Sequence, residues 1–419
     1  MRFYILWAWM IKKIGVKRRN QLVCIWFILS LMVETRKHSL NFAATLSGLN
    51  KAQFSKFLSI NYNVAACTLD SLSKKQAKAL SKNLKKIECL PWSISIMIDS
   101  TLHNRSTLKT ENSQKFNHGN GYVIGHQWTN IILYINGITI PLSPIPFYSK
   151  SYCRKMKIKY KTEHERIVEY LNNLNLDEYI GPHMSQDVVV LADSGYDVKQ
   201  IQNTIIEKGW HFIIALKNSR GIKSEAQYAK TPKSSDWNKV SKFFTDQRIL
   251  AWETIRIFSN GPKKKRLDYR IRHTIAFLKG VGKIQVVCSE FKKSSKGRRK
   301  FLGCSDLKIK PRQILIGYKL RWKIEVFHKH VKMHMGFEDV AVKRFRAVEA
   351  HVHLVYCAYI LLHSDPPGMP ENAKTILDKQ QHIRNILENI KIANILNLLT
   401  QFGGVDKLKT ELKAVLMAA

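Results

Sequence analysis

The chain begins with helical periodicity and changes to strand periodicity near residue 93. Residues 38–88 repeat apolar positions at helical spacing, with polar breaks at 47–53 and 67–76. Short helices of this kind beside basic residues are compatible with a small DNA-binding domain and equally with a plain helical cap. We therefore assign residues 1–90 to a helical N-terminal region, for which binding of DNA ends is one of two expectations.

Strand and helix patterns then alternate over residues 91–216. Isoleucine occupies every second position of 94–98, which predicts a strand, and an Asn-Gly pair between two apolar runs predicts a β-hairpin. The expected strands are 93–99, 122–135, 138–147, 187–193 and 210–216, and the expected helices are 162–175 and 198–209. Three strands, helix, strand, helix, strand is the order of a ribonuclease-H-like core, so the predicted fold class is α/β.

A β-rich insertion is predicted to interrupt this core at residues 217–310. Four strand patterns separated by basic turns lie at 249–258, 269–278, 283–291 and 299–307. Helical periodicity resumes over 311–364, which we assign to the second part of the core. The segment 365–419 begins with a Pro-rich linker and continues as an amphipathic helix, whose apolar face is expected either to pack on its own domain or to form a dimer.

The apolar run 21–33 is shorter than the roughly 20 residues that a membrane-spanning helix needs. The residues that follow it offer no Ala-x-Ala cleavage site of a signal peptide. We therefore expect a buried helix here and no membrane partner. Residues 1–19 are compatible with a poorly ordered extension or with an upstream start.

Composition favours a polyanionic partner. Of the 419 residues, 69 are Lys or Arg and 31 are Asp or Glu, which gives a formal net charge of +38. Three basic runs without acids lie at 150–161, 262–266 and 292–300. Such an excess of positive charge favours nucleic acid. The seven cysteines form no Cys-x-x-Cys pair, which is typical of reduced thiols in a cytosol and argues against a disulfide framework or a zinc knuckle.

Two acidic residues terminate predicted buried strands. Asp99 ends the first strand and Asp193 ends the fourth. Because these strands are neighbours in the predicted topology, both carboxylates are expected at one edge of the sheet. Buried acids are costly unless they are paired or bound to metal. With Glu325 from a later helix as a third carboxylate, the hard oxygen ligands suit two Mg²⁺ ions that activate a hydroxyl and stabilise a leaving oxygen.

Glu325 belongs to a polar face of a predicted helix at 318–332. Four polar residues fall within about 60° of one another at 100° per residue, and they are Tyr318, Arg321, Glu325 and Lys332. The opposite face is apolar and expected to be buried, and it consists of Leu320, Ile324, Phe327 and Val331. Taken alone, the polar face also fits a solvated surface with an ordinary ion pair between Arg321 and Glu325.

Three motifs resolve this choice by a family resemblance, and they are MIDST at 97–101, LADSGYD at 191–197 and the spacing of Tyr318, Arg321, Glu325 and Lys332. Together they resemble the DDE transposases of bacterial insertion sequences, specifically the insertion-sequence-four type, whose YREK signature has this spacing. The resemblance extends over roughly residues 90 to 363 and includes a β-rich insertion before the glutamate.

The resemblance implies roles for particular residues. It implies that two divalent ions, Mg²⁺ with Mn²⁺ as a substitute, are held by Asp99, Asp193 and Glu325. It implies that phosphates of the transposon end are held by Tyr318, Arg321 and Lys332, with Trp322 and Lys329 flanking them. Arg and Lys suit this role because they offer a bidentate fork and a point charge, respectively.

Three further observations carry weaker hypotheses. A zinc site formed by His328, His330 and His334 would lack any accompanying Glu or Cys at a zinc spacing. Asp197 is expected to cap the following helix. In related transposases that form a DNA hairpin, an aromatic residue of the insertion stacks on a flipped base, and Trp237 and Trp252 are the candidates here.

The function that the resemblance implies is cut-and-paste DNA transposition. Water nicks the ends of the element, and the freed 3′-hydroxyl then attacks target DNA. The implied partners are terminal inverted repeats, target DNA and a second copy of the chain, in the bacterial cytosol. Two alternatives stay open: a domesticated DNA-binding protein without activity, against which the three acids argue, and a nuclease of the same fold that cuts without strand transfer.

Overall fold

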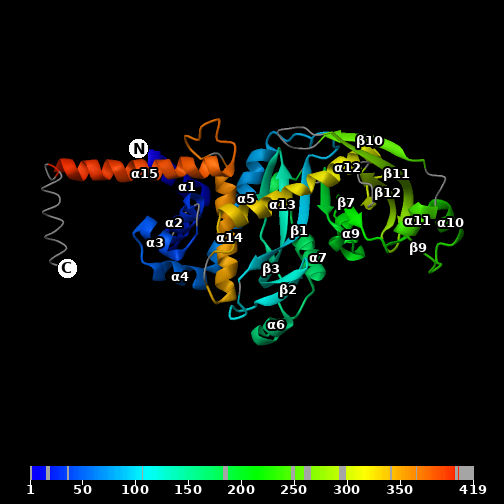
Figure 1. Cartoon of the computed structure of the whole chain (residues 1–419), viewed down its shortest axis with the longest axis horizontal. Helices are drawn as coiled ribbons and strands as arrows, with labels where there is room; N and C mark the ends of the chain where they lie inside the picture. The colour runs from blue at the N-terminus through cyan, green and yellow to red at the C-terminus, as the bar shows by residue number, and fades with distance from the viewer. Residues whose placement is uncertain are drawn as a thin grey trace.

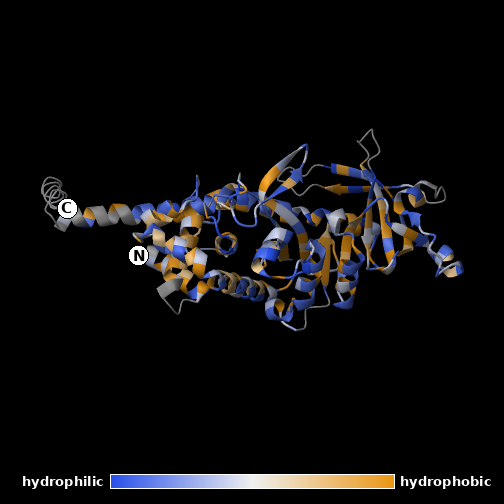
Figure 2. Ribbon diagram, turned by 90° about the horizontal axis from the view of Figure 1, so that it is seen from below, coloured by the Kyte–Doolittle hydropathy of each residue, from blue (hydrophilic) through white to orange (hydrophobic). Residues whose placement is uncertain are grey.

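The structure is a computed structural model that describes residues 2–15, 19–34, 37–105, 107–182, 187–246, 251–258, 266–291, 299–339, 342–364, 366–401 and 404. It has an elongated shape with helices at one end, a mixed sheet through the middle and antiparallel strands at the other end (Figure 1). Apolar residues concentrate between the elements and polar residues on the outside (Figure 2).

Among the described residues, 13 strands join in one mixed sheet. Its first part consists of β1 (Ile94–Asn104), β2 (Gln114–His118), β3 (Gly121–Ile135), β4 (Ile138–Pro141), β5 (Ile145–Pro146), β6 (Val188–Ala192) and β7 (His211–Leu216). Strand β3 is antiparallel to β1, β2, β4 and β5, whereas β1, β6 and β7 are parallel neighbours. The predicted adjacency of the first and fourth core strands, β1 and β6, is confirmed.

The predicted hairpin forms because its turn has the required residues. Asn136 and Gly137 both have positive φ, at 48° and 86°, as a two-residue type I′ turn demands. The expected single strand after this turn is instead divided into β4 and β5. Pro141, Pro144 and Pro146 lack the N–H that a continuous ladder needs, which accounts for the division.

The strands of the predicted insertion continue the same sheet. They are β8 (Gly221–Ser224), β9 (Asn238–Lys239), β10 (Glu253–Phe258), β11 (Arg266–Leu278), β12 (Gly282–Phe291) and β13 (Lys300–Cys304). Strand β13 pairs antiparallel with β7 and joins β12, β11, β8 and β9 to the core in that order. The insertion thus lies directly beside the edge of the core sheet.

Helices cover both ends and faces of this sheet. The N-terminal helices are α1 (Arg2–Ile14), α2 (Arg19–Val33), α3 (Leu40–Ser47), α4 (Lys51–Ile60) and α5 (Tyr62–Ser81). The central ones are α6 (Lys150–Met156), α7 (Glu163–Asn173), α8 (Asp177–Ile180), the 3₁₀ turn η1 (Ser194–Tyr196), α9 (Lys199–Glu207), α10 (Glu225–Lys230) and α11 (Val240–Asp246). The last ones are α12 (Pro311–Leu320), α13 (Trp322–His334), α14 (Phe345–Leu362) and α15 (Ile376–Gln401).

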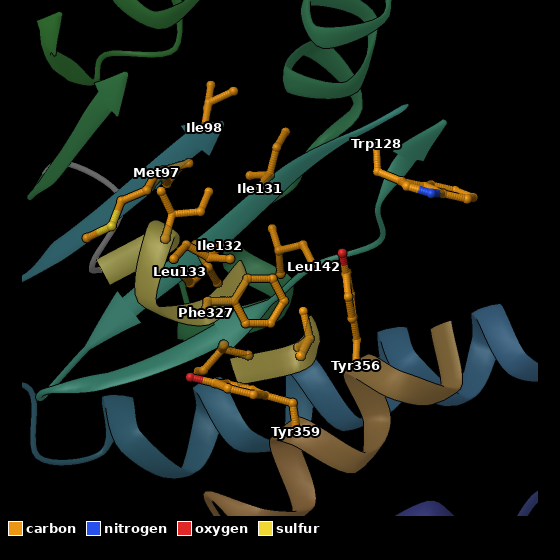
Figure 3. Packing of buried hydrophobic residues seen from close by; sticks show 14 of the residues in the cluster. Met97, Ile98, Trp128, Ile131, Ile132, Leu133, Leu142, Phe327, Tyr356 and Tyr359 are labelled. Atoms are coloured by element: carbon orange, nitrogen blue, oxygen red, sulfur yellow. The ribbon is translucent and has the colours of Figure 1, made fainter. Parts of the chain in front are cut away.

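Helix α14 lies at the centre of the apolar core. Phe327 of α13 packs edge-on against Tyr356 and Tyr359 of α14, with ring centroids 5.0 and 4.9 Å apart (Figure 3). By length and composition α14 alone among the described helices could cross a membrane, and 94% of that stretch is buried inside the fold. Its apolarity is therefore satisfied by packing.

The first helix of the chain is ordered and packs against the rest of the protein. Residues of α1 pack into the core through Leu6, Met10 and Ile14, so a poorly ordered extension is wrong for this segment. The predicted buried helix at 21–33 is confirmed as part of α2. The rings of Trp7 and Trp26 join the two helices at a centroid distance of 4.5 Å.

The predicted helix at 318–332 is divided into α12 and α13. Arg321 keeps helical dihedral angles, but the local hydrogen bonds change to i→i+3 pairs: Arg321 N donates to Tyr318 O at 3.2 Å, and Ile324 N to Arg321 O at 3.1 Å. Such bonds tighten the turn and end the regular α-helix. The predicted apolar face is nevertheless confirmed, since all of its members are buried: Leu320, Ile324, Phe327 and Val331.

Two other segments complete the comparison. The basic run 150–161 contains α6, whereas most of the runs 262–266 and 292–300 lies outside the described residues. In α15, Ile383 is buried and Arg384 Nη2 donates to Val33 O at 2.6 Å, so its first part packs on its own chain. Its last part extends beyond the N-terminal helices (Figure 1), and dimerisation through it stays a prediction.

Candidate active site

Asp99 lies within β1, just past the last residue that pairs in parallel with β6, and Asp193 directly follows β6. Asp99 follows Ile98 in β1, and Ile98 is paired in register with Ala192, the last residue of β6. Asp193 follows Ala192 directly and begins the turn η1. The expectation that the first strand ends at Asp99 is wrong, because β1 continues to Asn104 in antiparallel pairing with β3. The adjacency of β1 and β6 nevertheless brings both acids to one place, as the sequence predicted.

Backbone hydrogen bonds orient both carboxylates. Oδ1 of Asp99 accepts a hydrogen bond from Ser100 N at 3.0 Å. Oδ1 of Asp193 accepts one from Gly195 N at 2.8 Å and so caps η1. A carboxylate that caps a turn is held close to its own backbone.

Arg321 connects Asp99 with Glu325. Its Nη1 lies 3.5 Å from Oδ2 of Asp99, and its Nη2 donates a hydrogen bond to Oε1 of Glu325 one helical turn later. The side chains of Arg321 and Asp99 are 13% and 17% exposed, and that of Glu325 is 30% exposed. The predicted polar face is therefore largely covered and directed toward the strand ends, which argues against an ordinary solvated surface.

Burial raises the pKa of Asp99 to about 7. The guanidinium of Arg321 lowers this pKa, whereas the negative charges of Asp193 and Glu325 raise it. The three acids therefore lie within electrostatic range of one another. A raised carboxyl pKa means that the ionised form lacks compensating charge, and a further cation would favour ionisation.

The donor set suits a divalent cation by its chemistry, because carboxylate oxygens are the hard ligands that Mg²⁺ and Mn²⁺ prefer. In the part of the chain that the structure describes, however, no three His, Cys, Asp or Glu side chains are grouped closely enough to hold a metal ion. Arg321 lies between Asp99 and Glu325, and Asp193 faces the backbone of Gly195. Side-chain rotation would have to bring the acids together around an ion.

Tyr318 and Lys300 lie beside these acids on the side of the insertion. Nζ of Lys300 is 4.9 Å from the ring centroid of Tyr318, and Cζ of Arg321 is 5.7 Å from it. Burial and the charge of Arg321 lower the pKa of Lys300, whereas Asp193 and Glu325 raise it. Lys300 is therefore a further cation within range of the carboxylates.

A cavity of about 400 Å³ lies between α12 and the insertion strands, and both Lys300 and Tyr318 line it. Trp322, with 62% of its surface exposed, lines the same cavity. The predicted flanking position of Trp322 is thus compatible with contact to a substrate.

Lys332 lies further along β1 than the acids. Its Nζ donates to Leu102 O at 2.5 Å and is 3.4 Å from Oε1 of Glu338. Together with Ser100 and Thr101 it lines a cavity of about 550 Å³. Lys329 is exposed. Burial lowers the pKa of the neighbouring His330 and His334, and the charge of Lys329 lowers it further. The structure therefore brings Lys332 to a groove beside Asp99, and it leaves Lys329 on the outer surface.

The histidines of α13 do not converge on a metal. His328 is buried, and its Nε2 lies 2.9 Å from Nδ2 of Asn130. Burial, with the charges of Lys332 and Arg321, lowers the pKa of His328 to about 3. His330 and His334 are neighbours with ring centroids 6.1 Å apart, but His328 is engaged elsewhere and the described residues offer no third ligand.

The expectation that Asp197 caps a helix is wrong. Helix α9 begins after Val198 and has no side-chain cap. Asp197 is instead buried, and its Oδ2 accepts from Lys217 N at 2.9 Å while its Oδ1 lies 3.4 Å from Nε of Arg220. Its role is to join the end of η1 to the segment after β7, a contact that sequence distance conceals.

The two tryptophans of the insertion contact basic side chains. Trp252 has the guanidinium groups of Arg270 and Arg272 at 5.0 and 4.5 Å from its ring centroid. Trp237 has Nζ of Lys223 at 4.9 Å. Neither lines the cavity beside Tyr318, whereas Trp322 does. Their role in base stacking stays a prediction.

Sequence reasoning named Lys300 only as the last member of a basic run. One feature of the sequence could have pointed to Lys300. It lies at the start of a predicted strand of the insertion, and such a strand can bring its first residues close to a core strand if the two strands pair. Strand β13, which Lys300 begins, pairs with β7, the neighbour of β6. That pairing connects segments far apart in the sequence, so local periodicity could not reveal it.

Comparison with known proteins relates part of the chain to one family. Residues 159–361 match the family model of the transposase DDE domain, and this match includes Asp193 and Glu325. A search of curated proteins returned no match. Over residues 159–361 the chain is therefore similar to the transposase DDE domain family.

Proposed function

We propose that the chain catalyses cut-and-paste transposition of a bacterial insertion sequence of the insertion-sequence-four type. The observation that carries the proposal is that Asp99 of β1, Asp193 after β6 and Glu325 of α13 lie within electrostatic range of one another. DNA is the substrate that the family implies, and a net charge of +38 suits a polyanion.

The proposed catalytic core is ribonuclease-H-like. In support, β4, β3, β1, β6 and β7 follow one another across the sheet, with β3 antiparallel to β1 and with β1, β6 and β7 parallel. Helices α7 and α9 connect the later strands in the order that the sequence predicted. The strands β8 to β13 then form the proposed insertion before the helix that bears Glu325.

Asp99, Asp193 and Glu325 would hold the divalent ions. When bound, such ions lower the pKa of an attacking hydroxyl and neutralise charge that develops on the leaving oxygen. The acids contribute by holding negative charge at the site. Asp99 ionises only when the pH exceeds its pKa of about 7 or when a bound cation lowers that pKa.

The cations around the acids would position the DNA backbone. Arg321 and Lys300 lie on the insertion side and Lys332 on the β2–β3 side, so phosphates could be held on both flanks of the scissile bond. Tyr318 lies between Arg321 and Lys300 and offers a phenolic donor. Charged donors of this kind contribute more than neutral ones to phosphate binding.

The proposed assembly is a homodimer on the two ends of the element, in the bacterial cytosol. Free thiols are consistent with a reducing compartment, since all seven cysteines are unpaired in the structure. The exposed residues Ile392 and Leu396 of α15 are compatible with a contact between two copies.

The decisive experiment incubates the purified chain with the terminal inverted repeats that flank its own gene, target DNA and Mg²⁺. We expect cleavage at the ends and a joined product. Asp193→Asn should abolish cleavage and leave binding to the ends largely intact. Binding without cleavage by the unaltered chain would favour a domesticated DNA-binding protein, and cleavage without joining would favour a nuclease.

A further inference from the structure

Glu163 is a fourth carboxylate near the candidate site, and neither the motifs nor the family resemblance gives it a role. It is the first residue of α7, directly after the N-cap Thr162. A capping box orients this helix end: Thr162 Oγ1 accepts from Glu165 N at 3.3 Å, and Glu165 Oε2 accepts from Thr162 N at 2.7 Å. The direction of Glu163 is therefore set by a rigid local motif.

Three side chains donate hydrogen bonds to the Glu163 carboxylate. Oε1 accepts from Thr129 Oγ1 at 2.6 Å and from the Tyr196 hydroxyl at 3.2 Å. Oε2 accepts from Gln127 Nε2 at 3.0 Å. Gln127 and Thr129 belong to β3, and Tyr196 belongs to the turn η1 that follows Asp193. Glu163 thus connects three elements that are distant in sequence.

Tyr196 is the link between Glu163 and the acids. It is buried, only three residues after Asp193, and its ring lies 6.4 Å from that of His164, the neighbour of Glu163. Nε2 of His164 also lies 3.1 Å from Gly195 O. Burial raises the pKa of Tyr196, and Glu163, Asp99 and Asp193 raise it further, so its phenol stays protonated and can donate.

The carboxylate of Glu163 supports the site from the opposite face of the sheet. Thr129 is paired with Ser100, and Asn130 is paired with Asp99. Paired residues of antiparallel strands point to the same face and successive residues to opposite faces. Asn130 contacts His328 of α13, so Asp99 shares the face of α13. Glu163, bonded to Thr129, lies across the sheet and cannot itself ligate beside Asp99.

We propose that Glu163 is a positioning residue that, through Tyr196, fixes the backbone of the turn that carries Asp193 and so favours binding of a divalent cation by the carboxylates. The proposal rests on the proposed function, because it takes Asp99, Asp193 and Glu325 as the acids of the site. Outer-shell partners of ligating groups typically change metal affinity or activity by 10- to 100-fold, on the order of what we expect here.

The test measures Mn²⁺ binding to the full chain without DNA, by isothermal titration calorimetry. Glu163→Ala should weaken the apparent Mn²⁺ affinity by roughly 10- to 100-fold. Glu163→Gln keeps an acceptor oxygen for Thr129 and Tyr196 and should recover most of that loss. The matched control is Glu169→Ala, which removes an exposed carboxylate of the same helix that pairs with Lys161 and should leave the affinity unchanged.

Tyr196→Phe removes the hydroxyl alone and tests the proposed link. It should reproduce the effect of Glu163→Ala, and the double variant should bind Mn²⁺ no more weakly than either single variant, because both changes break the same connection. Thermal unfolding of all variants separates positioning from folding: Glu163→Ala should unfold at a lower temperature than Glu169→Ala, because Thr129 and Tyr196 lose an acceptor, but it should remain folded at the temperature of the titration.

Several outcomes would overturn the proposal. In the first, Glu163→Ala binds Mn²⁺ as tightly as the unaltered chain. In the second, the unaltered chain shows no saturable Mn²⁺ binding. In the third, the variants lose Mn²⁺ affinity only in proportion to their loss of thermal stability. End cleavage measured in parallel distinguishes the two levels. Normal cleavage, together with no effect of Glu163→Ala on Mn²⁺ affinity, would contradict the positioning role and still support the transposase function. Mn²⁺ binding that depends on Glu163, without any cleavage, would support the positioning role and contradict the proposed function.

Discussion

The guanidinium of Arg321 donates a hydrogen bond to the carboxylate of Glu325 one helical turn further along the chain. The i→i+3 bonds at Arg321 divide α12 from α13 at this point, and the same guanidinium reaches Asp99 at 3.5 Å. Substituting Glu325 and substituting Arg321 should therefore have different consequences.

Glu325→Gln should abolish end cleavage in Mg²⁺ and in Mn²⁺ with little loss of stability. The substitution preserves size and an acceptor oxygen for Arg321, but it removes the negative charge that a divalent ion requires. The measurement is single-turnover cleavage of a labelled end beside a thermal unfolding curve. Normal cleavage by the folded variant would show that Glu325 is not the third carboxylate.

Arg321→Ala should leave residual nicking that increases with DNA concentration or with Mn²⁺. The acids remain, and what is lost is the proposed phosphate contact, which would contribute about 1.5–3 kcal/mol per charged hydrogen bond. Arg321→Lys keeps the charge and loses the bidentate fork, so its activity should lie between those of Ala and Arg. Equal and complete loss in both variants at every DNA concentration would contradict a role in phosphate binding.

Affinity for DNA should fall steeply with salt. Each phosphate contact releases condensed counterions, and six or more contacts predict a decrease on the order of a thousandfold between 50 and 200 mM salt. Fluorescence anisotropy of a labelled terminal repeat measures this slope directly. A nearly flat dependence would argue that the cations around the site do not contact phosphates.

Glu349 should make stability depend on pH. Burial in α14 raises its pKa from 4.5 to about 7, although a hydrogen bond from Tyr148 and the charges of Arg346 and Arg166 lower it. Between these two pH values the unfolded chain ionises Glu349 while the folded chain keeps the proton, so this group makes stability fall as pH rises from 4.5 to about 7.

Glu349→Gln removes this dependence and keeps an acceptor for Tyr148. Relative to the unaltered chain, the variant should gain on the order of 3 kcal/mol of unfolding free energy as pH rises through that window, with no further gain above it. Urea unfolding at several pH values measures the difference. A constant difference across the window would show that Glu349 ionises normally in the folded chain.

Phe327→Ala should destabilise the core without changing any charge at the site. The ring is fully buried against Tyr356 and Tyr359, and truncation of such a side chain costs about 3–5 kcal/mol. Trp322→Ala, five residues earlier and 62% exposed, is the control and should change stability by less than about 0.5 kcal/mol. Chemical unfolding of the two variants separates the apolar face from the polar one.

Several features of this protein follow from the sequence alone because they depend on local sterics and periodicity. Alternating isoleucines and an Asn-Gly turn determine β1 and the hairpin around Asn136, and the helical repeat determines which face of α13 is buried. The order of strands and helices predicts that β1 and β6 are neighbours, and this adjacency brings Asp99 close to Asp193. The sequence did not show that β1 continues past Asp99 to Asn104, because that extension depends on its pairing with β3.

Other features were decided by contacts between segments that are far apart in the chain. The pairing of β13 with β7 brings Lys300 to Tyr318, and the packing of α7 under β3 brings Glu163 to Tyr196. Asp197, which by local pattern resembles a helix cap, is instead a buried ion-pair partner of Arg220. Local propensity constrains only a few neighbouring residues, whereas these contacts arise from how whole elements pack, so only the tertiary structure could decide them.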